Sequence, residues 1–279
     1  MREHLKLLRI KHYIKNLIIF LPVIFGGKIS DKATLIQAFL GFACFCVMSS
    51  AIYILNDYMD IENDRKHPVK KNRPLASGKV SKTFAVIMFI VLFLMAGALS
   101  FAIGSIYGAL FLLLYLLLNI AYSLKLKQIP ILDIAILASG FAIRVMYGGA
   151  ITDIEISKYL FLVVVTGSLY LGLGKRRNEL RANTDTREVL KHYNESFLDK
   201  NMYVCSALTQ VFFTLWTIDL DNKRIVWTVP VFIVIMMRYS YCIEGESDGD
   251  PVEVFLKDKL LMLLIVGYAL ILFLLLFCF

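Results

Sequence analysis

The stretch that decides how this chain folds and functions is 56–81, NDYMDIENDRKHPVKKNRPLASGKVS, a polar segment entered from an apolar run. If the apolar helix continues through it, Asp57, Asp60 and Asp64 stand at i, i+3 and i+7 and share one face, with Asn56 at the margin. Three adjacent carboxylates repel one another and favour a hard cation that prefers oxygen ligands. We therefore predict that these three aspartates bind Mg²⁺, which commonly bridges carboxylates and a substrate diphosphate.

Basic residues follow the aspartates directly. Two of them, Arg65 and Arg73, are predicted to contact an anionic substrate, because guanidinium groups suit phosphate oxygens. The other basic residues of the loop are Lys66, Lys70, Lys71 and Lys79. The alternative is that all these charges are solvated at the end of a membrane helix. The triple aspartate spacing and the Asn72-Arg73-Pro74 sequence that closes the loop favour a site.

The composition indicates an integral membrane protein. The chain has 279 residues, of which 58% are hydrophobic, and its mean hydropathy is +0.69. Its 19% charged residues gather in a few loops, which is typical of a helical membrane bundle with one polar end. The five cysteines show no C-x-x-C spacing and suit a core better than a disulfide or zinc framework. No long basic and aromatic segment accompanies the net charge of +8, so a nucleic-acid partner is not expected.

Apolar periodicity predicts an all-α, polytopic bundle of about nine transmembrane helices in a single domain, 1–279. The expected spans are 12–27, 34–57, 82–104, 106–124, 130–150, 157–176, 202–219, 224–243 and 259–279. Most of the 30 Lys and Arg residues fall on one side of this arrangement. By the positive-inside rule, the N-terminus and every polar motif are cytoplasmic, around a cavity that opens to that side.

Three residues beside helix ends are further candidates for substrate contact. Lys15 precedes Asn16 at the end of the first span, and Tyr122 and Lys125 leave the fourth. Lys and Tyr also anchor helices at the membrane interface without any catalytic role. The two interpretations stay open at this point.

Asp133 and Arg144 are ionisable residues within the fifth span. Their separation of 11 residues, about three helical turns, places them on one face. Ionisable groups at membrane depth commonly face a polar cavity, so this face is expected to line the substrate chamber. A purely structural tether is the alternative.

The sixth span ends in Gly172-Leu-Gly-Lys175-Arg176-Arg177-Asn-Glu179. Small residues in such a helix usually permit close packing. Lys175 and Glu179 can form a simple i, i+4 salt bridge. Their place at the same membrane end as the aspartates instead favours Lys175, Arg176 and Glu179 as a second contact for an anionic substrate.

The N-D-x-x-D-x-x-x-D pattern of 56–64, on the second span and followed by a basic loop, resembles the UbiA superfamily of intramembrane prenyltransferases. The rest of the chain is similar to its phosphoribosyltransferase branch. The segments that carry this similarity are Lys15-Asn16 with Pro22, 72–76, 122–125, 140–144, 174–179 and 249–258. Aromatic prenyltransferases carry a second D-x-x-x-D where this chain has Lys175 to Glu179, so a second carboxylate-bound metal there is in doubt.

The resemblance implies a UbiA-like fold and Mg²⁺-dependent transfer of 5-phosphoribose from phosphoribosyl pyrophosphate to a polyprenyl phosphate in the bilayer. The alternative within the superfamily is prenyl transfer from an allylic polyprenyl diphosphate to an aromatic or other small acceptor. A transporter with intramembrane carboxylates is a third possibility, but the sequence shows no convincing internal repeat. A homo-oligomer is left open.

Overall fold

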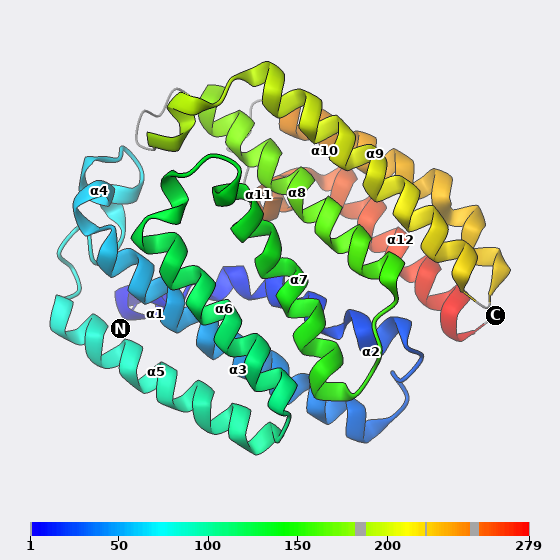
Figure 1. Ribbon diagram of the computed structural model, residues 1–279, viewed down its shortest axis with the longest axis horizontal. Helices are drawn as coiled ribbons and strands as arrows, with labels where there is room; N and C mark the ends of the chain where they lie inside the picture. The colour runs from blue at the N-terminus through cyan, green and yellow to red at the C-terminus, as the bar shows by residue number, and fades with distance from the viewer. Residues whose placement is uncertain (1, 182–187, 221, 246–250, 279) are drawn as a thin grey trace. The chain divides into compact units, whose positions relative to one another are not determined.

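The computed structural model describes residues 2–181, 188–220, 222–245 and 251–278, and within them every regular element is a helix. The all-α prediction is therefore confirmed for the described part of the chain. The α-helices are α1 (Arg2–Leu7), α2 (Leu21–Phe25), α3 (Lys32–Met59), α4 (Ile61–Lys66), α5 (Lys82–Ile103), α6 (Ile106–Leu124), α7 (Leu132–Thr152), α8 (Lys158–Arg181), α9 (Glu195–Asp219), α10 (Val229–Glu244), α11 (Pro251–Lys257) and α12 (Lys259–Phe277) (Figure 1). The 3₁₀ segments are η1 (Ile10–Phe20), η2 (Lys70–Asn72), η3 (Leu126–Gln128), η4 (Glu188–His192) and η5 (Lys223–Thr228).

In the part of the chain that the structure describes, six helical segments are long and apolar enough to cross a bilayer: Lys32–Met59, Lys82–Ile103, Ile106–Leu124, Leu132–Thr152, Lys223–Glu244 and Lys259–Phe277. Their number supports a multi-pass membrane protein. The first expected span is instead η1 followed by the short α2. Two more expected spans lie in α8 and α9, which are long but contain more polar and charged residues. The count of nine transmembrane helices thus stays a prediction.

Backbone contacts divide the chain into two compact units. The first comprises Met1–Ile136 with Ile143–Glu155, and the second comprises Leu137–Ala142 with Ile156–Phe279. The first therefore contains helices α1 to α6 and the second contains α8 to α12, while α7 contributes to both. That the two units form a single domain stays a prediction.

Helix α3 is the central helix of the first unit. In its most apolar window 61% of the residues are buried, against 11% in α5, which packs along it (Figure 1). One apolar cluster joins Phe45 and Ile52 of α3 to Tyr115 of α6 and Tyr147 of α7. Because α3 is packed on several sides, its last turn, which contains Asp57 and precedes Asp60, is held in place.

A close approach between backbones fixes α7 against η1. A Cβ atom on Gly148 would lie 2.2 Å from the carbonyl oxygen of Ile19, whereas one on Gly97 of α5 would have nothing within 4 Å. We expect Gly148→Ala to lower the thermal midpoint of the detergent-solubilised protein, because a backbone carbonyl cannot yield as a side chain can. Gly97→Ala, the matched control, should leave it unchanged or slightly raised, since Ala is the better helix former. Equal midpoints for the two variants would contradict this packing.

In the second unit, α8 and α9 pack along much of their length, and the Thr209 hydroxyl donates to the Thr166 hydroxyl at 3.0 Å between them. Helix α12 begins at its N-cap Asp258, which accepts from the Leu261 backbone N–H at 2.6 Å and from Arg238 Nη2 at 2.6 Å. These two interactions hold the pKa of Asp258 at about 2, the Arg238 hydrogen bond contributing most. Asp258, part of the last segment of the family resemblance, therefore has a structural role as a helix cap.

Candidate active site

The acidic segment does not form one continuous helix. Helix α3 ends at Met59, Asp60 leaves helical geometry with φ −98° and ψ 9°, and α4 begins at Ile61. The expectation of a single helix through Asp64 is therefore wrong. The three carboxylates on either side of the break do not share one partner, because Asp57 and Asp64 both contact Arg73. Asp60 instead contacts Lys127.

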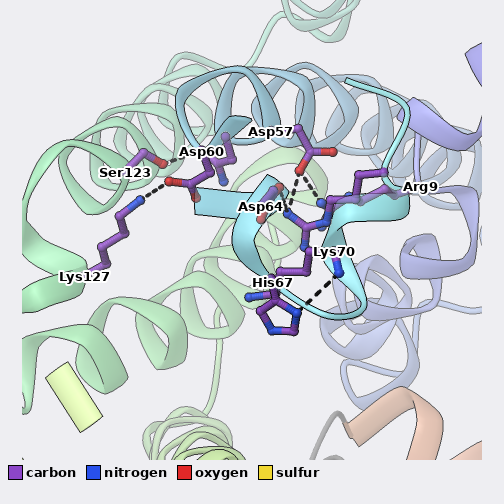
Figure 2. A network of polar contacts seen from close by, with 10 residues as sticks. Arg9, Asp57, Asp60, Asp64, His67, Lys70, Ser123 and Lys127 are labelled. Atoms are coloured by element: carbon purple, nitrogen blue, oxygen red, sulfur yellow. Dashed lines mark hydrogen bonds and ion pairs between the residues drawn. The ribbon is translucent and has the colours of Figure 1, made fainter. Parts of the chain in front are cut away.

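Asp57 and Asp64 still converge, because both contact the same guanidinium group. Arg73 Nη1 donates to Asp57 Oδ1 at 3.0 Å and to Asp64 Oδ2 at 2.7 Å. A second guanidinium, that of Arg9, donates to the same Asp57 oxygen (Figure 2). Asp57 and Asp64 are only 3% and 4% exposed, so these counter-ions offset the cost of burying the two carboxylates.

Asp60 faces a different partner. Its carboxylate accepts from the Lys127 ammonium group, and the neighbouring Asn56 side chain accepts from the Ser123 hydroxyl (Figure 2). Both partners come from the end of α6 and from η3. In the described residues no three His, Cys, Asp or Glu side chains are grouped closely enough to hold a metal ion. The expected three-aspartate face is thus a carboxylate pair, Asp57 and Asp64, with Asp60 beside it in a separate ion pair.

The pair nevertheless fits a divalent cation. Two carboxylate oxygens from different helices lie within 3.0 Å of one nitrogen of Arg73, so they already converge on a single positive group. Oxygen ligands of this kind are those that Mg²⁺ prefers, and it commonly uses only one or two carboxylates.

The remaining predicted residues of the first unit differ in their burial and in their contacts. Arg65 is exposed and turns away from the aspartates, donating to Glu62 at 2.9 Å and to the Ala76 carbonyl at 3.1 Å. Lys15 and Tyr122 are half-buried and Lys125 is exposed. Of the predicted basic contacts in the first unit, Arg73 is the one for which the structure gives an ion pair with the aspartates.

Arg144 lies in a deeper polar network. Its Nε donates to Asn16 Oδ1 at 2.7 Å and its Nη2 donates to the Tyr115 hydroxyl at 2.9 Å. Its guanidinium carbon also lies 4.9 Å from the centre of the Phe45 ring, a cation–π contact. Arg144 and Asp133 are both buried, as expected of ionisable residues at this depth, and these contacts tie η1, α3, α6 and α7 together.

The second unit holds the other predicted cluster. Arg176 is fully buried and donates to Glu179 at 2.6 Å, while Lys175 is half-buried. Arg177, which the sequence does not single out, forms an ion pair with Asp199 of α9. Whether Lys175, Arg176 and Glu179 meet the same substrate as the aspartates stays a prediction. Gly249 and Asp250 of the last similar segment lie outside the described residues.

Sequence reasoning missed Arg9 and Lys127 as partners of the aspartates. Arg9 is one of several basic residues near the N-terminus, and no periodicity distinguishes it from them. Lys127 stands two residues after the chosen Lys125. The sequence shows only that Lys125 and Lys127 both lie near the end of an apolar span. This position does not indicate which of the two lysines contacts Asp60.

The fold and the site define a multi-pass, all-helical membrane protein whose buried carboxylate pair lies at the end of a transmembrane helix. A family model described as the UbiA prenyltransferase family matches residues 19–266. The chain belongs to this family, and it is a transferase of the UbiA type.

Relatives and solved structures agree with this assignment. A protein of Corynebacterium glutamicum named decaprenyl-phosphate phosphoribosyltransferase is 31% identical, over 95% of this chain and 84% of its own. A protein of the same name from Mycolicibacterium smegmatis is also 31% identical, over 95% of this chain and 89% of its own. A UbiA homologue of Archaeoglobus fulgidus, solved with GPP and Mg²⁺ bound, superposes with a TM-score of 0.76 at 20% identity and covers 97% of this chain and 99% of its own. The similarity to the Archaeoglobus fulgidus structure supports the UbiA-like fold.

Proposed function

We propose that this protein transfers 5-phosphoribose from phosphoribosyl pyrophosphate to a polyprenyl phosphate and releases pyrophosphate. The observation that carries the proposal is similarity along nearly the full length to two relatives named decaprenyl-phosphate phosphoribosyltransferase. The site supports it, because buried carboxylates beside several cationic side chains suit a metal–diphosphate group.

Asp57 and Asp64 would hold Mg²⁺ at this site. Asp60, the third predicted ligand, would have to exchange its Lys127 partner before joining them. When bound, the ion supplies positive charge that neutralises the pyrophosphate as it leaves. Arg73 and Arg9, which occupy the carboxylates in the structure, would then be available to donate to phosphate oxygens.

The reaction needs no general base from the protein. The attacking oxygen belongs to a phosphate of the lipid and is already anionic at neutral pH, so the residues need only bind and orient the two substrates. The anomeric carbon of the donor gains oxocarbenium character as the bond to pyrophosphate breaks, and the ribosyl group passes to the lipid phosphate. Lys125, Lys175 and Arg176 remain predicted phosphate contacts that act as fixed counter-charges.

The distribution of Lys and Arg along the chain supports an active site on the cytoplasmic side, in a cavity that opens to that face, with about nine helices crossing the cell membrane. A polyprenyl tail could then stay within the bilayer while its phosphate reaches the site. We propose this orientation together with the reaction.

Prenyl transfer from an allylic diphosphate to a small acceptor is the second candidate. The Archaeoglobus fulgidus UbiA homologue was solved with GPP and Mg²⁺, and a carboxylate pair of the kind seen here would serve either donor. The carboxylates alone do not discriminate between the two reactions.

Direct transfer of label tests the proposal. Purified protein incubated with Mg²⁺, labelled phosphoribosyl pyrophosphate and a polyprenyl phosphate should yield a labelled lipid, and chelation of the metal should abolish the product. Absence of labelled lipid, together with turnover of an allylic diphosphate and an aromatic acceptor, would reject the proposed reaction and favour the alternative.

A further inference from the structure

A pocket of about 510 Å³ lies beside the carboxylate pair, on the side of the N-terminal segment. Among the described residues its lining includes the basic side chains of Lys6, Arg9, Lys11 and Arg73 and contains no acid. His12 completes the polar part of the lining. Such a concentration of donors without a carboxylate in the wall suits an anion.

The pocket and the aspartates share two side chains. Arg9 and Arg73 line the pocket and also donate to Asp57, so they stand between the two sites. A guanidinium group has five N–H donors, and the hydrogen bonds to the aspartates use one nitrogen of each arginine. An anion in the pocket could therefore bind these arginines while Asp57 keeps its counter-ions.

The backbone at Arg9 shapes this pocket. Arg9 has φ 51° and ψ 45°, the left-handed region, which is unfavourable for a residue with a side chain. The resulting turn separates α1 from η1 and lets Lys6 on one side and Lys11 on the other line the same pocket. Strained backbone of this kind tends to persist at functional sites.

The edge of the pocket is apolar. Leu5 and Ile10 belong to its lining and are 51% and 52% exposed. Along η1 the exposed side chains of Ile14 and Leu17 follow Ile10. A ligand with an anionic head and a hydrocarbon chain would satisfy both the basic wall and this exposed apolar stripe.

We propose that this pocket binds a phosphate monoester carried on a hydrocarbon chain, with Arg9 and Lys11 as the residues that hold the phosphate. The inference rests on the proposed function in one respect: the ligand would be the lipid acceptor, placed beside the metal–diphosphate site. A soluble phosphate monoester, such as the 5-phosphate of the donor, offers the same chemistry without the apolar chain.

Binding of farnesyl phosphate to the full-length protein in dodecyl maltoside, measured by calorimetry with EDTA present, tests the assignment without turnover. Lys11→Gln is the informative variant, because Lys11 lines the pocket but does not contact the aspartates. Loss of one charge-assisted hydrogen bond should weaken binding about tenfold. The matched control is Lys32→Gln, the same charge change at the exposed first residue of α3, which should bind as the unaltered protein does.

The outcomes separate the ligand classes. Tenfold weaker farnesyl phosphate binding in Lys11→Gln alone, with weak binding of ribose 5-phosphate and inorganic phosphate throughout, supports the proposal. If Lys11→Gln weakens ribose 5-phosphate and leaves farnesyl phosphate unchanged, the lipid assignment is overturned. Unchanged affinity for all three ligands overturns the phosphate site itself.

Assays of transfer and binding with the unaltered protein and Lys11→Gln distinguish failure of the pocket assignment from failure of the proposed reaction. If the unaltered protein transfers labelled phosphoribose but Lys11→Gln leaves the KM for polyprenyl phosphate unchanged, the pocket assignment fails and the reaction stands. If no phosphoribose is transferred while farnesyl phosphate binding depends on Lys11, the reaction fails and the pocket assignment stands.

Discussion

Replacing Asp57 with Asn is expected to lower the turnover number by about 10²–10³-fold, the size of effect seen when a group that stabilises transition-state charge is removed. Asp57 is buried and is the carboxylate on which both Arg9 and Arg73 converge. Asn has nearly the same shape but no charge, so it would bind a divalent ion poorly while preserving the packing. The rate of lipid labelling measures the loss of turnover, and the circular dichroism spectrum shows whether the variant is folded.

Glu62→Gln is the matched control for that substitution. Glu62 is a carboxylate on the adjacent α4, but its side chain is 72% exposed and pairs with Arg65. Its loss should change turnover by less than about twofold, because an exposed ion pair contributes little. Near-normal turnover in Asp57→Asn, or an equal loss in both variants, would remove Asp57 from the metal site.

Replacing Arg73 with Gln is expected to give a large loss of stability. The substitution leaves Asp64 without its guanidinium partner and Asp57 with Arg9 alone, although both carboxylates are almost buried. Breaking a buried ion pair from one side typically costs about 3–5 kcal/mol. The thermal midpoint in detergent should therefore fall strongly, and added Mg²⁺ should restore part of it, because a divalent ion can replace the missing positive charge.

Arg65→Gln provides the comparison. Arg65 precedes Arg73 by eight residues, is exposed, and pairs with Glu62 on the surface. Its substitution should lower the midpoint only slightly and should show no recovery on addition of Mg²⁺. If Arg73→Gln and Arg65→Gln unfold at the same temperature, the carboxylate pair does not depend on Arg73 in the way the structure indicates.

The sequence predicts the long apolar helices well, because length and hydropathy are strong and local signals. Spans such as 34–57 and 106–124 agree closely with α3 and α6. The first span is less regular, since 12–27 contains a 3₁₀ segment and a short α2 with Pro22 in its first turn. Hydropathy indicates that such a segment is apolar, but it does not predict which type of helix the segment forms.

At the site, the sequence identifies the correct acidic segment and one of its basic partners, Arg73. It does not predict the helix break at Asp60, nor that Asp60 pairs with Lys127 from a distant part of the chain. Arg9 is missed for the same reason: its turn and its contact with Asp57 depend on tertiary packing. Composition and spacing carry no information on such long-range partners.

Metal binding by the carboxylate pair can be measured directly by electron paramagnetic resonance of Mn²⁺ as a substitute for Mg²⁺. Titrated in the presence of pyrophosphate, the unaltered protein and Glu62→Gln are expected to bind Mn²⁺ equally. The double variant Asp57→Asn, Asp64→Asn should bind it at least about tenfold more weakly, since it lacks both anionic ligands. Unchanged Mn²⁺ affinity in a folded double variant would show that Asp57 and Asp64 do not bind the metal.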